Sequence, residues 1–194
     1  MGSRRLEAFS DGVFAIIITI MVLEIGVPRG DSLENLLPLL PVFLSYALSF
    51  VYIGIYWNNH HHMLHLCTTA TGAVLWANLH LLFWLSLLPF ATRWMGENQF
   101  ATLPTALYGA VLLMAANAYY LLEQTIIRAQ GPDSILKRAV GRDWKAKLSL
   151  VLCIAAIGVS LRSPWIADVI FVALALIWLI PDRRVENVLR ASEA

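Results

Sequence analysis

Apolar segments recur six times along the chain, and short polar breaks separate them. The segments cover residues 8–27, 35–64, 72–95, 103–127, 145–162 and 165–181. An α-helix rises about 1.5 Å per residue, and the hydrocarbon core of a bilayer is about 30 Å thick. Each segment is therefore predicted to form a transmembrane helix. We expect an all-α membrane protein, with a single six-helix transmembrane domain over residues 1–194.

The composition of the chain supports a membrane protein. Apolar residues make up 59% of the 194 residues, and charged residues make up 14%. Soluble domains carry about 25% charged residues, so we expect membrane lipids as the surroundings of this chain. The formal net charge is +1, which argues against a nucleic-acid partner. Two cysteines are too few for a disulfide framework.

The distribution of Lys and Arg predicts the orientation of the helices. With both termini in the cytoplasm, eleven Lys and Arg residues lie on the cytoplasmic side, and Arg29, Arg93 and Arg162 lie on the other. Cytoplasmic loops of membrane proteins carry such an excess. We therefore expect a multi-pass protein of the cell membrane with both termini cytoplasmic. The first segment lacks a small-x-small cleavage pattern, so it is expected to remain in the mature chain.

The first apolar segment has two different faces when it is drawn as a helix. Ile20 and Leu23 lie within about 40° of Ile16, and Thr19 lies about 60° from it. Asp11 lies about 140° from Ile16, on the opposite side. One face is thus an apolar row with one hydroxyl group. The other carries a carboxylate that lipid cannot satisfy, so we expect Asp11 to find partners on neighbouring helices.

Polar side chains of the second and third segments are the candidate partners of Asp11. They are Trp57, Asn58, His60, His61 and Asn78. Asn, His and Trp side chains can all donate a hydrogen bond to a carboxylate. In the orientation above, the start of the first segment and the end of the second lie on the same side of the membrane. We therefore expect a buried Asp11–His–Asn–Trp network.

Three motifs resemble one known family. Arg5 with Phe9-Ser10-Asp11 reproduces the R-x-x-x-F-S-D signature of the transmembrane protein 175 family, the endosomal and lysosomal potassium channels and their prokaryotic relatives. The stretches IGIYWNNHH and NLHLLFWLSLLPFAT follow in the same order as in that family. Prokaryotic members carry one six-helix repeat and form tetramers, whereas animal members fuse two repeats and dimerise. The resemblance thus implies a homotetramer with a pore lined by helix 1 of each subunit.

The resemblance also implies roles for individual residues. The apolar constriction of the family lies five, nine and twelve places after the Asp, at Ile16, Ile20 and Leu23 here, and its selectivity-linked hydroxyl corresponds to Thr19. The implied function is a potassium channel with a hydrophobic gate, weakly selective for K+ over Na+ among monovalent cations, and with no cofactor. The motif residues act in packing and assembly, and by position these are Arg5, Phe9, Ser10, Asp11, Trp57, Asn58, His60, His61 and Asn78.

Other readings of the same residues remain open. The apolar row of the first segment could serve helix packing or lipid contact alone. Asp11 and the histidines of the second segment could form a proton relay in a proton-coupled secondary transporter, although no inverted repeat is visible. His61 and His65 could hold a metal, but no nearby carboxylate or Cys completes the set, and we expect no metal site. We expect no enzyme, because a nucleophile or complete metal set is missing.

Overall fold

The computed structural model of the protein describes residues 3–132, 134–140 and 144–179. Within these ranges the chain forms helices and no strand. The helices are α1 (Ser3–Leu23), the 3-10 helix η1 (Leu33–Leu39), α2 (Leu40–His65), α3 (Gly72–Ser86), α4 (Leu88–Glu97), α5 (Thr102–Gln130), α6 (Ile135–Val140), α7 (Trp144–Ser160) and α8 (Pro164–Leu179). The predicted all-α fold is confirmed for the described part of the chain.

Four of the predicted spans have the length and composition to cross a membrane. They cover Arg4–Leu23, Leu33–His65, Gly72–Glu97 and Thr102–Gln130. The two remaining described apolar helices, Lys147–Ser160 and Pro164–Leu179, are shorter than the about 20 residues that a perpendicular crossing needs. A protein with six membrane crossings therefore stays a prediction. The last two residues of the predicted segment 165–181 lie outside the described residues.

Proline positions explain where the helices differ from the predicted segments. The segment 72–95 was expected to be one helix, but it consists of α3 and α4 with a break at Leu87. Pro89 lies in the first turn of α4, where its missing N–H and its ring prevent a regular helical continuation from α3. Similarly, residues 33–39 form η1 around Pro38, and α2 begins at Leu40 with Pro41 in its first turn.

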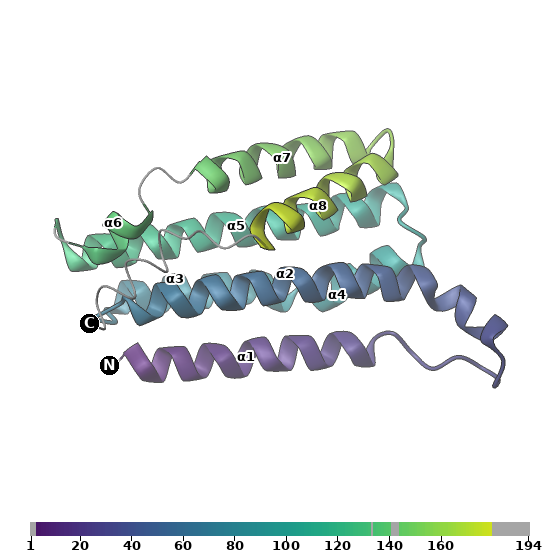
Figure 1. Cartoon of the computed structure of the whole chain (residues 1–194), viewed down its shortest axis with the longest axis horizontal. Coiled ribbons are helices and arrows are strands. Elements are labelled where there is room, and N and C mark those ends of the chain that lie inside the picture. The colour runs from purple at the N-terminus through teal and green to yellow at the C-terminus, as the bar shows by residue number, and fades with distance from the viewer. Residues whose placement is uncertain (1–2, 133, 141–143, 180–194) are drawn as a thin grey trace.

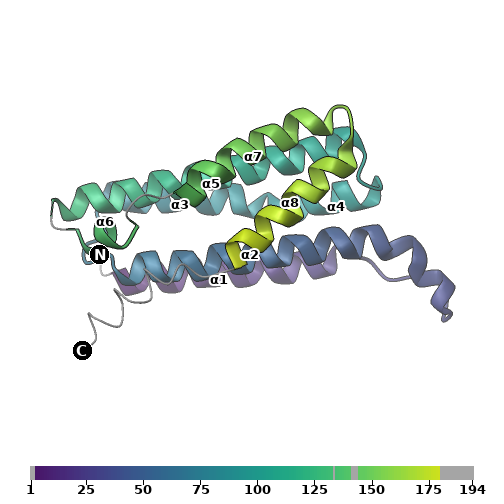
Figure 2. The ribbon, with the colours of Figure 1, turned by 45° about the horizontal axis from the view of Figure 1, so that its top comes forward.

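The helices form an elongated bundle in which most of them run along the long axis (Figure 1). Helix α1 lies at one edge of the bundle and packs against α2, α3 and α4. Helix α5 lies deeper, where it contacts α3, α4, α7 and α8. The shorter helix α8 runs obliquely across the bundle between α7 and α2 (Figure 2). One long face of α1 is therefore left without a partner in the single subunit.

The interior between α2, α4 and α5 contains a small hydroxyl cluster. Ser49 of α2 donates to the hydroxyl of Tyr108 at 3.0 Å. Because a serine has a single hydroxyl proton, Thr92 of α4 then donates to Ser49, at 2.7 Å. All three side chains are buried. The three hydroxyls thus bond to one another inside the bundle, where lipid would offer them no partner.

The two ends of the bundle differ in charge. The start of α1, the end of α5, α6 and the start of α7 lie together at one end (Figure 1). These segments carry Arg4, Arg5, Arg128, Lys137, Arg138 and Lys147. Arg29, Arg93 and Arg162 belong to segments at the opposite end. Basic residues are thus concentrated at one end of the bundle, and the cytoplasmic position of the termini stays a prediction. Arg142, Arg183, Arg184 and Arg190, four of the eleven residues expected on the cytoplasmic side, lie outside the described residues.

Candidate functional site

The face of α1 that the sequence marked as an apolar row is the face that the bundle leaves open. Ile16 is 58% exposed, Ile20 is 41% exposed and Leu23 is 79% exposed. Thr19 lies on the same exposed face. The opposite face packs into the bundle through Leu6, Ser10, Phe14, Ile17 and Met21. The structure therefore separates α1 into a packed side and an open side.

The hydroxyl of Thr19 has a defined orientation. Its Oγ1 donates its single proton to the carbonyl oxygen of Ile16, at 2.9 Å. A hydroxyl that has donated its proton keeps two lone pairs on oxygen. On the exposed face of α1, this oxygen can act only as an acceptor. It is therefore suited to a cation rather than to another acceptor.

A fully buried chain of hydrogen bonds joins α1, α3 and α2. The amide Nδ2 of Asn78 donates to Ser10 Oγ at 3.0 Å, and Ser10 donates to the carbonyl of Leu6 at 2.9 Å. On its other side, Asn78 Oδ1 lies 2.7 Å from His60 Nε2. Because an amide oxygen only accepts, His60 must carry its proton on Nε2. Ser10, His60 and Asn78 are each 0% exposed.

Asp11 bonds to one of its expected partners, Trp57. Its Oδ1 accepts a hydrogen bond from Trp57 Nε1 at 3.0 Å, and Asp11 is only half-buried. The expected network is therefore right for Trp57 and wrong for the buried His and Asn side chains, because Ser10 and not Asp11 bonds to Asn78, which in turn bonds to His60. The physical reason is the position of the neighbours. Successive residues are about 100° apart on a helix, so Ser10 faces α3 while Asp11 faces α2.

A second contact between α1 and α2 was not anticipated from the sequence. His61 Nδ1 lies 2.7 Å from Glu7 Oε1, one helical turn from the Asp11–Trp57 bond. Glu7 and Asp11 are four residues apart, and so are Trp57 and His61, so the two antiparallel helices meet at two successive turns. This matching i, i+4 spacing was the feature of the sequence from which the Glu7–His61 contact could have been predicted. We call these two contacts the α1–α2 ladder.

The remaining motif residues lie outside these contacts. Arg5, Phe9 and Asn58 are exposed in the single subunit. At the far end of α1, Glu24 lies 3.6 Å from Arg93, which also binds Glu97 at 2.8 Å. The Glu24–Arg93 ion pair joins the end of α1 to α4.

The histidines at the end of α2 do not gather a metal-ligand set. In the parts of the chain that the structure describes, no three His, Cys, Asp or Glu side chains come close enough together to hold a metal ion. His61 is engaged with Glu7, and its ring centroid lies 6.2 Å from that of His65.

The fold and the site define a class of protein. Long apolar helices surround buried polar side chains that bond to one another inside the bundle, among them Ser10, Asn78 and His60, and the edge helix exposes an apolar face. This combination is that of an integral membrane protein. Comparison with known proteins identifies the class more closely. The model of the family "Endosomal/lysosomal potassium channel TMEM175" matches residues 5–89.

Relatives and a solved structure match nearly the whole chain. A potassium channel of Chryseobacterium sp. (strain P1-3) is 53% identical over 190 residues, which are 98% of this chain and 99% of the relative. The crystal structure of a lysosomal potassium-selective channel TMEM175 homologue from Chamaesiphon minutus matches with a TM-score of 0.78 and 30% identity, over 92% of this chain and 96% of that one. The chain belongs to the TMEM175 family, a family of channels and not of enzymes.

Animal relatives match a shorter stretch. The endosomal/lysosomal proton channel TMEM175 of Gallus gallus is 36% identical over 109 residues, which are 50% of this chain and 22% of that protein.

Asn78→Leu tests the buried hydrogen-bond chain. The substitution keeps the approximate side-chain volume but removes the amide group of Asn78. His60 Nε2–H and Ser10 Oγ then each lose a hydrogen bond in a buried position. A stranded buried donor costs about 1–3 kcal/mol, so we expect a clear fall in the thermal unfolding temperature of the detergent-solubilised protein. Asn117→Leu on the exposed side of α5 is the matched control and should leave this temperature unchanged. Equal effects of the two variants would contradict the structural role of Asn78.

Proposed function

We propose that the protein is one subunit of a homotetrameric, potassium-permeable cation channel, and that α1 of each subunit lines its pore. The observation that carries this proposal is the open face of α1. Ile16, Thr19, Ile20 and Leu23 are all exposed there, while the opposite face of the helix is buried against the bundle. Membership in the TMEM175 family and the bacterial relatives that are named potassium channels support the choice of ion.

Oligomerisation follows from geometry, because one helix cannot enclose a path for an ion. Closed rotational symmetry brings the same face of each copy to a common axis. Helix α1 is suited to this position, since it lies at the edge of the bundle and packs on one side only. Phe9 and Trp57, which are 53% and 46% exposed in the single subunit, are positioned to be covered by neighbouring copies.

The apolar rings would act as a gate by excluding water. Four copies of Ile16, Ile20 and Leu23 would line the axis over two helical turns. A narrow apolar constriction loses its water when it closes, and a small widening is enough to wet it. The side chains themselves need no charge or metal to perform this task.

Selectivity would arise at Thr19, between the apolar rings. Its hydroxyl donates to the Ile16 carbonyl, so the oxygen presents lone pairs away from the helix. A ring of four such oxygens offers a partly dehydrated cation a single set of neutral ligands. One set discriminates less than a series of carbonyl rings, so we expect a weak preference for K+ over Na+.

The hydrogen bonds on the packed side argue against the proton-coupled transporter. A relay that starts at Asp11 needs a neighbouring group that can both accept and release a proton. The partner of Asp11 is the indole N–H of Trp57, which is a donor only. His60 bonds to the amide of Asn78 and not to Asp11. These contacts hold α1 in place and do not form a continuous relay.

The channel itself is tested by its stoichiometry and unitary current. We expect the purified protein to have a mass four times that of the 21.6 kDa chain in native mass spectrometry. In a planar bilayer with potassium salts, it should give discrete current steps. A dimer that shows only slow electrogenic transport would contradict the proposal and favour the carrier. A proton gradient applied alone would measure any proton current separately.

Leu23→Asn tests the apolar gate. The amide should attract water to the constriction, so we expect a higher leak current and weaker discrimination between cations. Leu121→Asn, an equal change at an exposed site of α5, is the control and should leave the current unchanged. A Leu23→Asn channel with wild-type current would remove Leu23 from the gate.

Thr19→Val tests the hydroxyl ring, because valine keeps the shape of threonine and lacks the oxygen. We expect tetramers to form normally and the K+ to Na+ permeability ratio to fall, as measured by reversal potentials under bi-ionic conditions. Ile18→Val is the control on the same helix, since Ile18 packs against the core and lies about 160° from Ile16. Altered selectivity in Ile18→Val together with wild-type selectivity in Thr19→Val would show that the assigned pore face is wrong.

A further inference from the structure

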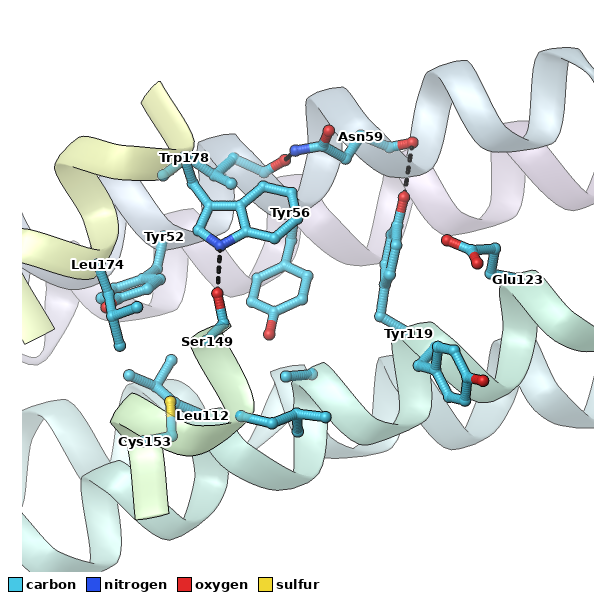
Figure 3. Close-up of a pocket in the computed structure, with 14 residues that line it drawn as sticks. Tyr52, Tyr56, Asn59, Leu112, Tyr119, Glu123, Ser149, Cys153, Leu174 and Trp178 are labelled. Carbon is cyan, nitrogen blue, oxygen red and sulfur yellow. Dashed lines mark hydrogen bonds between the residues drawn. The ribbon is translucent and has the colours of Figure 1, made fainter. Parts of the chain in front are cut away.

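A pocket lies between α2, α5, α7 and α8, away from the open face of α1 (Figure 3). The conduction path proposed above uses none of its residues. Tyr120 of α5, which is 49% exposed, lies at its rim, so the pocket is reached from the surface of the bundle.

Helix α2 forms a wall between this pocket and α1. Tyr52, Tyr56 and Asn59 line the pocket and lie within about 60° of one another on α2. Trp57 and His61, which form the α1–α2 ladder, lie about 140–180° from Tyr52. The two faces of one helix therefore serve the pocket and α1 separately. A molecule in the pocket would press on the helix that holds α1.

Aromatic and aliphatic side chains form most of the pocket wall. Tyr56, Tyr119 and Trp178 contribute rings, and Leu112 and Leu174 contribute aliphatic surface (Figure 3). Several polar atoms of the wall already have partners within it. Trp178 Nε1 donates to Ser149 Oγ at 2.7 Å, and the Tyr119 hydroxyl donates to the carbonyl of Asn59 at 3.3 Å. The middle of the pocket is thus suited to an apolar body.

One carboxylate lies at the end of this apolar pocket. Glu123 of α5 lines the pocket and is 4% exposed, and Figure 3 shows its side chain beside that of Tyr119. Glu123 Oε1 accepts a hydrogen bond from Gln124 Nε2 at 3.1 Å. A carboxylate has about four acceptor positions on two oxygens, so it can accept further donors beside its present partners. An ionisable group inside a membrane bundle is costly and marks a functional site by default.

We propose that this pocket binds a lipophilic monoamine, with its ammonium group at Glu123 and its apolar body among the aromatic rings of α2, α5 and α8. The chemistry of the two ends specifies this class. A charge-assisted hydrogen bond from an ammonium to a carboxylate is stronger than one between neutral groups. Tyrosine and tryptophan rings attract a nearby cation and also bury apolar surface. An anionic amphiphile would meet repulsion at Glu123.

Occupancy of the pocket would modulate the channel through α2. Because that helix carries both the pocket wall and the α1–α2 ladder, a ligand that displaces Tyr52 or Tyr56 changes the position of Trp57 and His61 against α1. This effect on current rests on the proposed channel function. The binding itself does not, and it is measured independently of conduction.

The test measures binding of 4-phenylbutylamine to the detergent-solubilised full chain by isothermal titration calorimetry, with 4-phenylbutanol as the uncharged probe. We expect the wild-type protein to bind the amine about tenfold more tightly than the alcohol. Glu123→Gln should weaken amine binding by about tenfold and leave alcohol binding unchanged. Ala116→Phe, which adds a ring to the pocket wall, should abolish binding of both probes.

Two control variants match these changes outside the pocket. Glu34→Gln on η1 and Ala129→Phe at an exposed position of α5 should bind both probes as the wild type does. Equal affinity of the wild type for amine and alcohol would overturn the proposal, and so would unchanged binding in Ala116→Phe, because both probes would then dissolve in the micelle or bind elsewhere. If Glu123→Gln does not fold, the wild-type comparison of amine with alcohol and the binding to Ala116→Phe still test the proposal. The amine should also change the open probability in planar bilayers, and an inactive channel would leave the calorimetric result intact.

Discussion

The position of α1 depends on the side chain of Asn78, which joins Ser10 and His60 from a third helix. In a bundle surrounded by hydrocarbon, a polar group without a protein partner has no solvent to replace it. The three groups are fully buried, so they specify the rotation of α1 as well as its depth. A rotation by one residue would move Ser10 by about 100° and break the chain of bonds. The same bonds therefore determine which face of α1 is left open.

The packed side of α1 combines interactions of different strength and location. The Ser10–Asn78–His60 chain is dry, whereas the Glu7–His61 and Asp11–Trp57 contacts are partly exposed. At the other end, Arg93 ties Glu24 to α4 through an exposed ion pair, and exposed pairs contribute little to stability. The polar contacts of α1 are thus buried near its start and exposed near Leu23, where buried apolar side chains such as Ile17 and Met21 make the packing contacts.

The sequence predicted the features that depend on a single helix. Apolar length located the four helices that can cross a membrane, and the helical period placed Ile16, Thr19, Ile20 and Leu23 on one face, where the structure leaves them exposed. Features that depend on how two helices meet were predicted only in part: Trp57 was among the candidate partners of Asp11, but the role of Ser10 was not anticipated. The period shows that Ser10 and Asp11 point in different directions, but not which of them faces α3. Glu7 was missed for the same reason, because its partner His61 is known only once the offset between α1 and α2 is known. The helix break at Leu87 was not predicted, because proline is often tolerated within membrane helices.

The open apolar face of α1 also bears on how the protein is made. In water, a row of exposed isoleucine and leucine side chains would promote aggregation of an unassembled chain. In a bilayer the same side chains contact lipid tails, which are equally apolar, so a single subunit is not forced to associate at once. Insertion and folding of each copy can therefore precede assembly. The hydrophobic effect does not drive association of the inserted subunits. Their association depends instead on close van der Waals packing and on the release of lipid. Lipid composition thereby becomes a determinant of how many inserted copies exist as complete assemblies.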